Sequence, residues 1–266
     1  MKKTIDFAHS QSALSVDKLS DGKILVFCDV RYEEDEEGGH RYFVARFNSD
    51  GSQEQMTELI FEPNIYAIQN DGKIVAPNSS EDAALSRFNI DGSLDNSFAN
   101  VEMLPSEPLA LAIQSDGKIV VAGFGYISRY NADGSFDLTF GDNGMITDFN
   151  YNPGSIFFGG DGKIVVSLKG SVNERNVDIG LVRFNSDGSP DNTFSGDSKL
   201  MYNTALDSTY YTGTAIQSNG KIAIAGYAIK GSVSDIALAR YHVDGSHRVQ
   251  FGFTNYTRSA IHQMEK

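Results

Sequence analysis

The chain has 266 residues, with 35 acidic against 22 basic side chains and a formal net charge of −13. This acidity argues against nucleic acids and anionic membrane surfaces as partners. The single cysteine, Cys28, cannot form an internal disulfide, and no apolar run has the length of a membrane span.

The first element along the chain is a short motif that recurs five times. Its clearest copy, residues 111–123, reads Leu-Ala-Ile-Gln-Ser-Asp-Gly-Lys-Ile-Val-Val-Ala-Gly. The Asp-Gly pair can supply the positive backbone angles of a tight hairpin turn, and the Val/Ile-rich run after it predicts a strand. The five copies are centred on Asp21, Asp71, Asp116, Asp161 and Asn219.

A second motif alternates with the first. It reads Arg-Phe-Asn or Arg-Tyr-Asn in four of its copies and runs into another Asp-Gly turn; its arginines are Arg46, Arg87, Arg129, Arg183 and Arg240. We predict four strands per repeat: one ending in Ala-Ile-Gln, one like Lys-Ile-Val-Val, one carrying the arginine, and one after Thr-Phe-Gly. No stretch shows helical periodicity.

Four strands in each of five successive repeats predict an all-β fold, a β-propeller of five four-stranded blades in a single repeat domain over residues 1–266. Residues 4–7 repeat the strand at 146–149, so we expect the N-terminal strand to complete the last blade and close the ring. A parallel solenoid is the rival architecture. Residues 260–266 echo the first motif faintly, which leaves a truncated sixth blade as another.

The two motifs together closely resemble the bacterial delta-sixty repeat, over nearly the whole chain. The resemblance is strongest over residues 109–148 and 178–194, and it weakens in the last repeat, where His242 and Arg248 replace Asn and Asp. It implies a β-propeller, usually within long secreted or surface proteins, to which no general biochemical activity has been assigned.

Residues that recur once per blade are expected to be scaffold, because a catalytic constellation is asymmetric and occurs once. We predict that the arginine of each second motif pairs with the aspartate three residues before the following Phe, as a partly buried arginine needs a partner. These aspartates are Asp95, Asp137 and Asp191. A ring of anion sites is the alternative for the arginines.

The turns also offer oxygen ligands at alternate positions, the spacing that suits a hard cation such as calcium. The alternative is that these side chains bond the backbone of their own turn. The candidate calcium ligands are Asn89, Asp91, Asp95, Asn131, Asp133, Asp137, Asn185, Asp187 and Asp191. We expect no other cofactor.

No catalytic motif is present, so we predict a non-enzymatic binding or interaction module with its ligand face on the loops. Exposed aromatic rings suit sugars or peptides. The candidate ligand-face residues are Tyr32, Tyr42, Tyr151, Tyr202, Tyr210 and Tyr211, for which blade packing is the alternative role. Two other functions stay open: a glycan-active hydrolase or lyase with a site at the axial channel, and a structural segment of a longer surface repeat protein.

A protein or carbohydrate partner, a monomeric state and no membrane insertion are expected. The compartment is ambiguous. No signal peptide is evident in residues 1–16, which as written predicts a cytoplasmic protein, whereas the family resemblance implies a secreted or cell-surface one.

Overall fold

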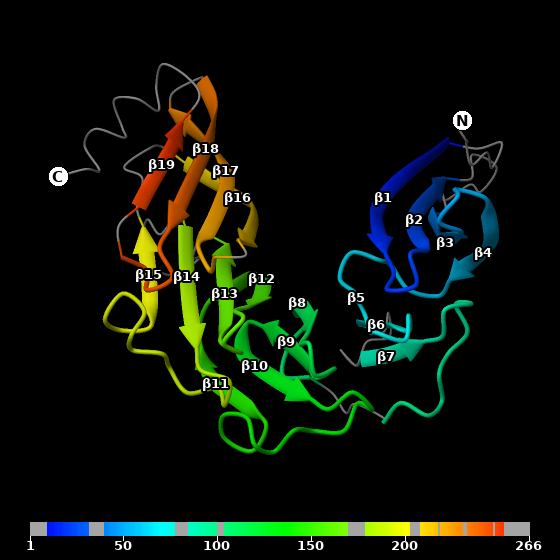
Figure 1. Ribbon diagram of the computed structural model, residues 1–266, viewed down its shortest axis with the longest axis horizontal. Coiled ribbons are helices and arrows are strands. Elements are labelled where there is room, and N and C mark those ends of the chain that lie inside the picture. The colour runs from blue at the N-terminus through cyan, green and yellow to red at the C-terminus, as the bar shows by residue number, and fades with distance from the viewer. Residues whose placement is uncertain are drawn as a thin grey trace. The chain divides into compact units, whose positions relative to one another are not determined.

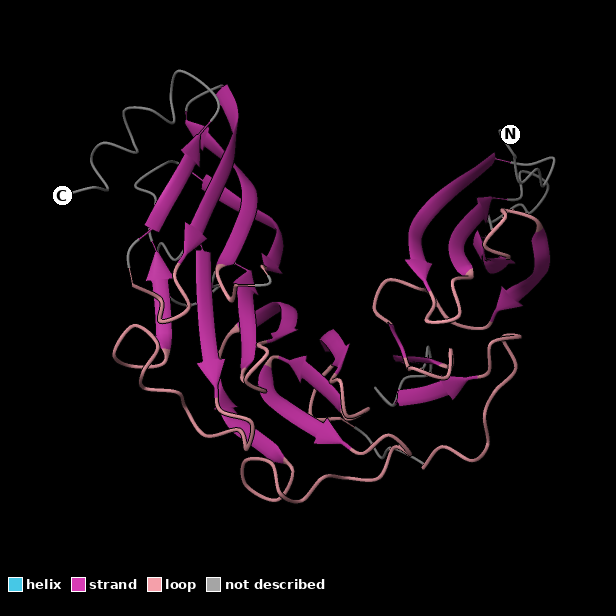
Figure 2. Cartoon of the chain, viewed as in Figure 1, coloured by secondary structure: helices cyan, strands magenta, loops and turns pink. Residues whose placement is uncertain are grey.

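The computed structural model describes residues 10–31, 40–77, 85–99, 104–169, 179–202, 208–217, 219–230, 233–246 and 248–252. All its regular elements are β-strands joined by turns and loops (Figure 1; Figure 2). They form five antiparallel sheets, and the chain is an all-β, five-bladed β-propeller, as predicted. The described residues contain no helix of the length and apolarity that crossing a membrane requires.

The chain divides into two compact units, which are described separately. Unit 1 comprises Met1–Leu104, Ser115–Lys118 and Asn131–Ser135, and unit 2 comprises Pro105–Gln114, Ile119–Tyr130 and Phe136–Lys266. Unit 1 thus holds the strands of the first two blades together with two turns of the third. The predicted closing strand at residues 4–7 and the echo at residues 260–266 lie outside the described residues.

Blades 1 and 2 belong to unit 1. In each, neighbouring strands pair in sequence order, as a simple meander does. The described part of blade 2 has three strands. The strands are β1 (Ser10–Lys18), β2 (Ile24–Arg31), β3 (His40–Phe47) and β4 (Gln53–Leu59) in blade 1, and β5 (Ala67–Ile68), β6 (Ile74–Pro77) and β7 (Leu85–Phe88) in blade 2.

The strands of blades 3 to 5 belong to unit 2 and form three four-stranded meanders. They are β8 (Pro108–Ile113), β9 (Ile119–Gly123), β10 (Gly125–Tyr130) and β11 (Met145–Phe149) in blade 3; β12 (Asn152–Phe158), β13 (Ile164–Lys169), β14 (Ile179–Phe184) and β15 (Lys199–Tyr202) in blade 4; and β16 (Ser208–Ile216), β17 (Ile222–Lys230), β18 (Val233–Tyr241) and β19 (Arg248–Gly252) in blade 5.

Within each unit, hydrophobic clusters lie between successive blades, because the inner strands are covered on both faces. Strand β13 shows the principle: Val166 packs into a cluster shared with blade 3, and Val165 packs into one shared with blade 5. Successive side chains of a strand point to opposite faces, so one apolar run serves two neighbours. A separate cluster joins blades 1 and 2 within unit 1.

The Asp-Gly turns match the sequence prediction at the glycine but not at the aspartate. At the first turn of blade 3, Gly117 has a φ of 87°, which a residue without a β-carbon adopts at no steric cost. The preceding Asp116 has no positive φ; its carboxylate instead accepts a hydrogen bond from the amide of Lys118 at 3.2 Å. Each residue of the pair therefore contributes to the turn by a different means.

Candidate functional site

The arginine of the second motif is the centre of a repeated clamp. In blade 3, Arg129 Nε donates to Asp137 Oδ2 at 2.7 Å, and the guanidinium carbon lies 4.6 Å from the centre of the Phe140 ring. Arg129 Nη1 donates to the backbone carbonyl of Ser186, in the Asp-Gly turn of blade 4. The Arg129 side chain thus forms an ion pair within its own blade and a hydrogen bond to the next blade.

The clamp recurs in the blades on either side. Blade 2 and blade 4 have the same ion pair at 2.7 and 2.6 Å and the same ring contact at 4.8 and 4.6 Å. The following turn again accepts through its carbonyl. The matching residues are Arg87, Asp95, Phe98 and Ala132 in unit 1, and Arg183, Asp191, Phe194 and Val243 in unit 2.

The aspartate of the clamp is saturated with donors. Lys163 Nζ donates to Asp191 Oδ2 at 2.7 Å, while Asp191 Oδ1 accepts from the amide and hydroxyl of Thr193 at 3.1 and 2.6 Å. Burial alone would raise the pKa of Asp191, but the hydrogen bonds from Lys163, Thr193 and Arg183 outweigh it and hold the pKa well below its usual range. The predicted arginine–aspartate pairs are therefore present in blades 2, 3 and 4.

The candidate calcium ligands are engaged inside their own turns. In blade 3, Asn131 Nδ2 donates to Ser135 Oγ at 3.0 Å, and Asp133 Oδ1 accepts from the amide and hydroxyl of Ser135 at 3.0 and 2.7 Å. The hydroxyl bond is the main cause of the lowered pKa of Asp133. The corresponding Asn, Asp and Ser bonds form in the turns that hold Asn89 and Asp91 and that hold Asn185 and Asp187.

Turn chemistry and ion pairing therefore account for these oxygens, and Asp95, Asp137 and Asp191 are members of the clamp. Within the described ranges, no three His, Cys, Asp or Glu side chains come together as metal ligands would. The backbone-bonding role is the one for which the geometry gives direct evidence.

Two of the six predicted ligand-face tyrosines can be placed, and both pack against a core cluster. Tyr42 is half-buried and donates to Glu62 Oε1 at 2.8 Å; burial first, and then this bond, raises its pKa to about 12. Tyr151 packs edge-on against Phe149 at 5.5 Å. Tyr32 and the side chains of Tyr202, Tyr210 and Tyr211 lie outside the described residues.

The junction between blades 1 and 2 departs from the clamp. Glu54 stands in blade 1 where blades 2 to 4 have the clamp aspartate, and it lies 3.2 Å from Arg46 Nε. Arg46 Nη2 donates to Asp21 Oδ2 at 3.2 Å, so both of these partners belong to its own blade. The turn glycine Gly92 faces the methyl group of Thr57, which a β-carbon at residue 92 would meet at 2.6 Å. The corresponding glycines of the later blades face a Phe ring instead.

A different hydrogen-bonded cluster joins the two blades here. Tyr66, just before β5, donates its hydroxyl proton to Asp17 Oδ2 on β1 at 2.5 Å, and the Ser15 hydroxyl also bonds the phenol oxygen. The Tyr66 ring lies 4.2 Å from that of Phe27. Burial, reinforced by the bond to Asp17, raises the pKa of Tyr66 well above its usual value, so the phenol stays protonated at neutral pH.

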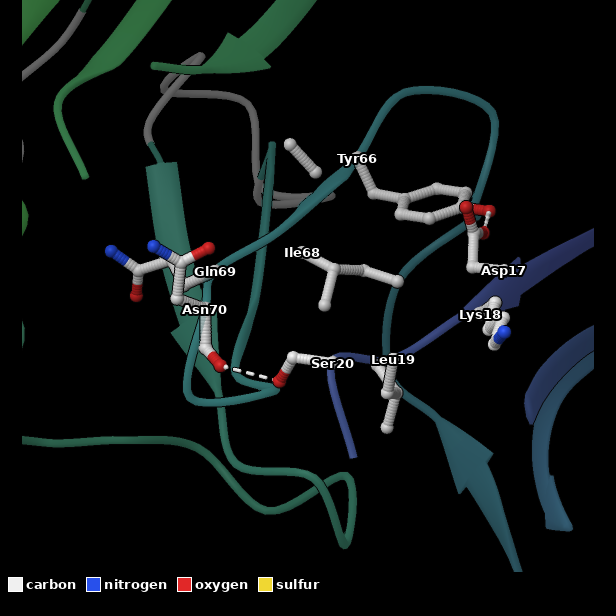
Figure 3. Close-up of a pocket in the computed structure, with 9 residues that line it drawn as sticks. Asp17, Lys18, Leu19, Ser20, Tyr66, Ile68, Gln69 and Asn70 are labelled. Atoms are coloured by element: carbon white, nitrogen blue, oxygen red, sulfur yellow. Dashed lines mark hydrogen bonds between the residues drawn. The ribbon is translucent and has the colours of Figure 1, made fainter. Parts of the chain in front are cut away.

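Beside this cluster the structure has a pocket of about 400 Å³ (Figure 3). Residues of β1 and the turn after it line one side, and residues around β5 line the other. In Figure 3 the Tyr66 ring approaches Asp17, and the Ser20 hydroxyl donates to the backbone carbonyl of Asn70 at 3.3 Å. The lining residues are Asp17, Lys18, Leu19, Ser20, Tyr66, Ala67, Ile68, Gln69 and Asn70.

The sequence predictions did not include Asp17 or Tyr66. Comparison of the repeats could have found both, because each departs from the motif. In blade 3 the residues at the same motif positions are Ala112 for Asp17 and Leu111 for Tyr66. A polar residue that replaces a repeated apolar one is the asymmetric signal expected of a site.

Comparison with known proteins supports the repeat assignment. A family model described as a domain of unknown function (DUF5122) beta-propeller matches residues 69–98, 114–140, 159–194 and 217–246. These four segments contain the turns and clamps of blades 2 to 4 and the corresponding part of blade 5. The chain is therefore built from β-propeller repeats. No curated protein matches it.

Several solved structures are similar at low identity. The extracellular domain of BT4673 from B. thetaiotaomicron is 12% identical with a TM-score of 0.49, over 94% of this chain and 34% of that one. PorZ, a surface component of the type-IX secretion system of Porphyromonas gingivalis, is 14% identical with a TM-score of 0.47, over 89% and 41%. An acylaminoacyl peptidase from Pyrococcus horikoshii is 11% identical with a TM-score of 0.47, over 92% and 46%. The chain thus spans less than half of each.

Proposed function

We propose that this β-propeller repeat protein, four segments of which match a family of unknown function, is a non-enzymatic binding module. Its ligand site is the pocket between blades 1 and 2. The finer identification as a delta-sixty repeat protein, and with it a secreted or cell-surface location, rests on the resemblance of the motifs.

The observation that carries the proposal is the departure from the repeat between blades 1 and 2. In blades 2, 3 and 4 the arginine of the clamp bonds the turn of the following blade. Where Glu54 and Arg46 turn to partners in blade 1, the Asp17–Tyr66 pair joins the blades beside a pocket of about 400 Å³. This volume is in the range of small-molecule sites.

Binding is preferred over hydrolysis because of the carboxylates. A glycosidase uses a pair of acids on either side of the bond that it cleaves. Asp17 is the one carboxylate among the residues lining the pocket, and it already accepts a hydrogen bond from Tyr66. A small ligand, rather than a nucleic acid or a membrane, is the partner that this pocket suits, and we propose that a monomer binds it.

The proposal is tested by blocking the pocket. Ser20 and Ser115 occupy the same position of the first motif in blades 1 and 3, and both are exposed, but only Ser20 lines the pocket. Ligand-detected NMR with a mixed library of small neutral, anionic and cationic compounds should give hits that the Ser20→Trp variant loses and the Ser115→Trp variant keeps. Hits that survive in both variants, or the absence of any hit, would refute a site in this pocket.

A further inference from the structure

The Asp17 carboxylate in the lining of the pocket differs from the clamp aspartates, because no described residue forms an ion pair with it. We infer that the pocket takes the ammonium group of a small organic cation, with the carboxylate of Asp17 as its counter-ion. This inference rests on the proposed function and names the chemical class of the ligand.

The first step is a comparison of aspartates within the protein. The clamp aspartates Asp95 and Asp191 each bind two cations, a lysine and an arginine, at 2.6 to 2.7 Å. Asp17 is partly buried, yet no described residue forms an ion pair with it. A carboxylate withdrawn from water is stabilised by an opposite charge, and no described residue supplies that charge to Asp17.

The second step concerns the two carboxylate oxygens. Tyr66 donates to Oδ2 of Asp17, and Ser15 bonds the phenol oxygen, so the carboxylate is held in one orientation. No described group donates to the other oxygen, Oδ1. An oriented carboxylate with a vacant oxygen can accept a charge-assisted hydrogen bond from an ammonium group.

The third step concerns the surroundings of that oxygen. The aromatic ring of Tyr66 adjoins the carboxylate, and aromatic rings attract organic cations as well as apolar groups. Ala67 and Ile68 add apolar surface for an alkyl chain. The next residue of β1, Lys18, also lines the pocket; it is exposed and forms no described ion pair with Asp17.

Long-range electrostatics favour the same class of ligand. The protein has a net charge of −13, which attracts cations and repels anions at low ionic strength. An anionic ligand would meet both this field and the Asp17 carboxylate. A neutral polyol would bond Oδ1 but would leave the charge without a partner.

Isosteric probes test the inference on the full chain by calorimetry. Cadaverine, 1,5-pentanediol and glutarate share a five-carbon chain and differ in charge. We expect cadaverine to bind at least about tenfold more tightly than either of the others, and Asp17→Asn to abolish this preference. Asp17→Glu, which keeps the charge, should retain a preference for cadaverine. Asp148→Asn removes an exposed strand carboxylate elsewhere and should change nothing.

A lysine derivative, Nα-acetyl-lysine N-methylamide, distinguishes a free amine from a lysine side chain of a protein partner as the source of the ammonium. Tighter binding of this derivative identifies a lysine side chain, and tighter binding of cadaverine identifies a free amine. If pentanediol binds as tightly as cadaverine, or glutarate binds more tightly, and Ser20→Trp abolishes that binding, the cation inference is overturned while the proposed binding module stands. Cadaverine binding that Ser20→Trp leaves unchanged would place it elsewhere and overturn the inference.

Discussion

The ring of Phe140 lies against Gly188 so closely that a β-carbon at residue 188 would come within 2.9 Å of it. Phe140 belongs to the clamp of blade 3, and Gly188 belongs to the Asp-Gly turn of blade 4. The same relationship joins Phe194 to Gly245 within unit 2, and Phe98 to Gly134 within unit 1. The glycine that makes the turn also leaves room for the Phe ring of the preceding blade, because it has no β-carbon.

This double role predicts an unequal pair of substitutions. Gly188→Ala should destabilise the protein by about 2–4 kcal/mol, because a φ of 88° is strained for alanine and the new methyl also meets the ring. Gly51→Ala, at a φ of 79° with no described atom within 4 Å of its β-carbon, should cost about 1–2 kcal/mol. Urea unfolding of both variants measures the difference, and equal losses would show that the ring contact contributes nothing.

A second prediction separates the buried ion pair from its exposed counterpart. Asp137→Asn keeps an acceptor for Thr139 but leaves the buried Arg129 without this carboxylate, and it should destabilise the fold by about 3–5 kcal/mol. Glu54→Gln makes the matching change in blade 1, where the glutamate side chain is 36% exposed. That variant should lose about 1 kcal/mol or less. A comparable loss in both would mean that burial does not distinguish the two pairs.

The clamp aspartates predict a loss of stability in acid. Hydrogen bonds from Lys73 and Ser97, with that from Arg87, hold the pKa of Asp95 below the value of about 3.9 in the unfolded chain. A lowered folded pKa stabilises the protein above about pH 5, and this contribution is lost as the pH falls through the unfolded and then the folded pKa. The melting temperature of the wild type should therefore drop more steeply from pH 5 to pH 3 than that of Asp95→Asn. Parallel curves would contradict this.

At alkaline pH the sign reverses for Tyr42. Its folded pKa of about 12 exceeds the usual value of about 10, because burial and the hydrogen bond to Glu62 favour the protonated phenol. The resulting stabilisation is complete below pH 10 and is lost as the pH rises toward 12. Between pH 9 and pH 11, the melting temperature of the wild type should fall relative to that of Tyr42→Phe. A constant difference between the two would rule out this linkage.

Sequence periodicity predicted the repeating elements of the fold because the same turn and strand motifs recur in every blade. The Asp-Gly turns fix the strand ends, and the Arg129–Asp137 pair follows from the need of a buried arginine for a carboxylate. The sequence could not tell that Arg129 also reaches the carbonyl of Ser186, since a backbone acceptor in the next blade has no residue-type signature.

The pocket was harder to predict than the fold. The sequence directed attention to tyrosines in the longer loops, whereas Tyr66 lies just before a short strand and owes its place to the packing of blade 2 on blade 1. Asp17 lies in the first motif of blade 1, six residues before Lys23 of the Asp-Gly-Lys turn. Its departure from the repeat could be read from the sequence, but its proximity to Tyr66, 49 residues away, required the structure.

The clamp has a direction: Arg87, Arg129 and Arg183 each hold a turn that lies later in the chain. During synthesis on the ribosome, the guanidinium of Arg129 therefore has no carbonyl to bind until Ser186, 57 residues downstream, has left the exit tunnel. Blades 2, 3 and 4 each emerge before the turn that their clamp arginine binds, so this contact forms only after the next blade has been synthesised. Release of the nascent chain before blade 5 appears would leave Arg183 without its acceptor at Val243, and blade 4 would lack the contact that joins it to the next blade.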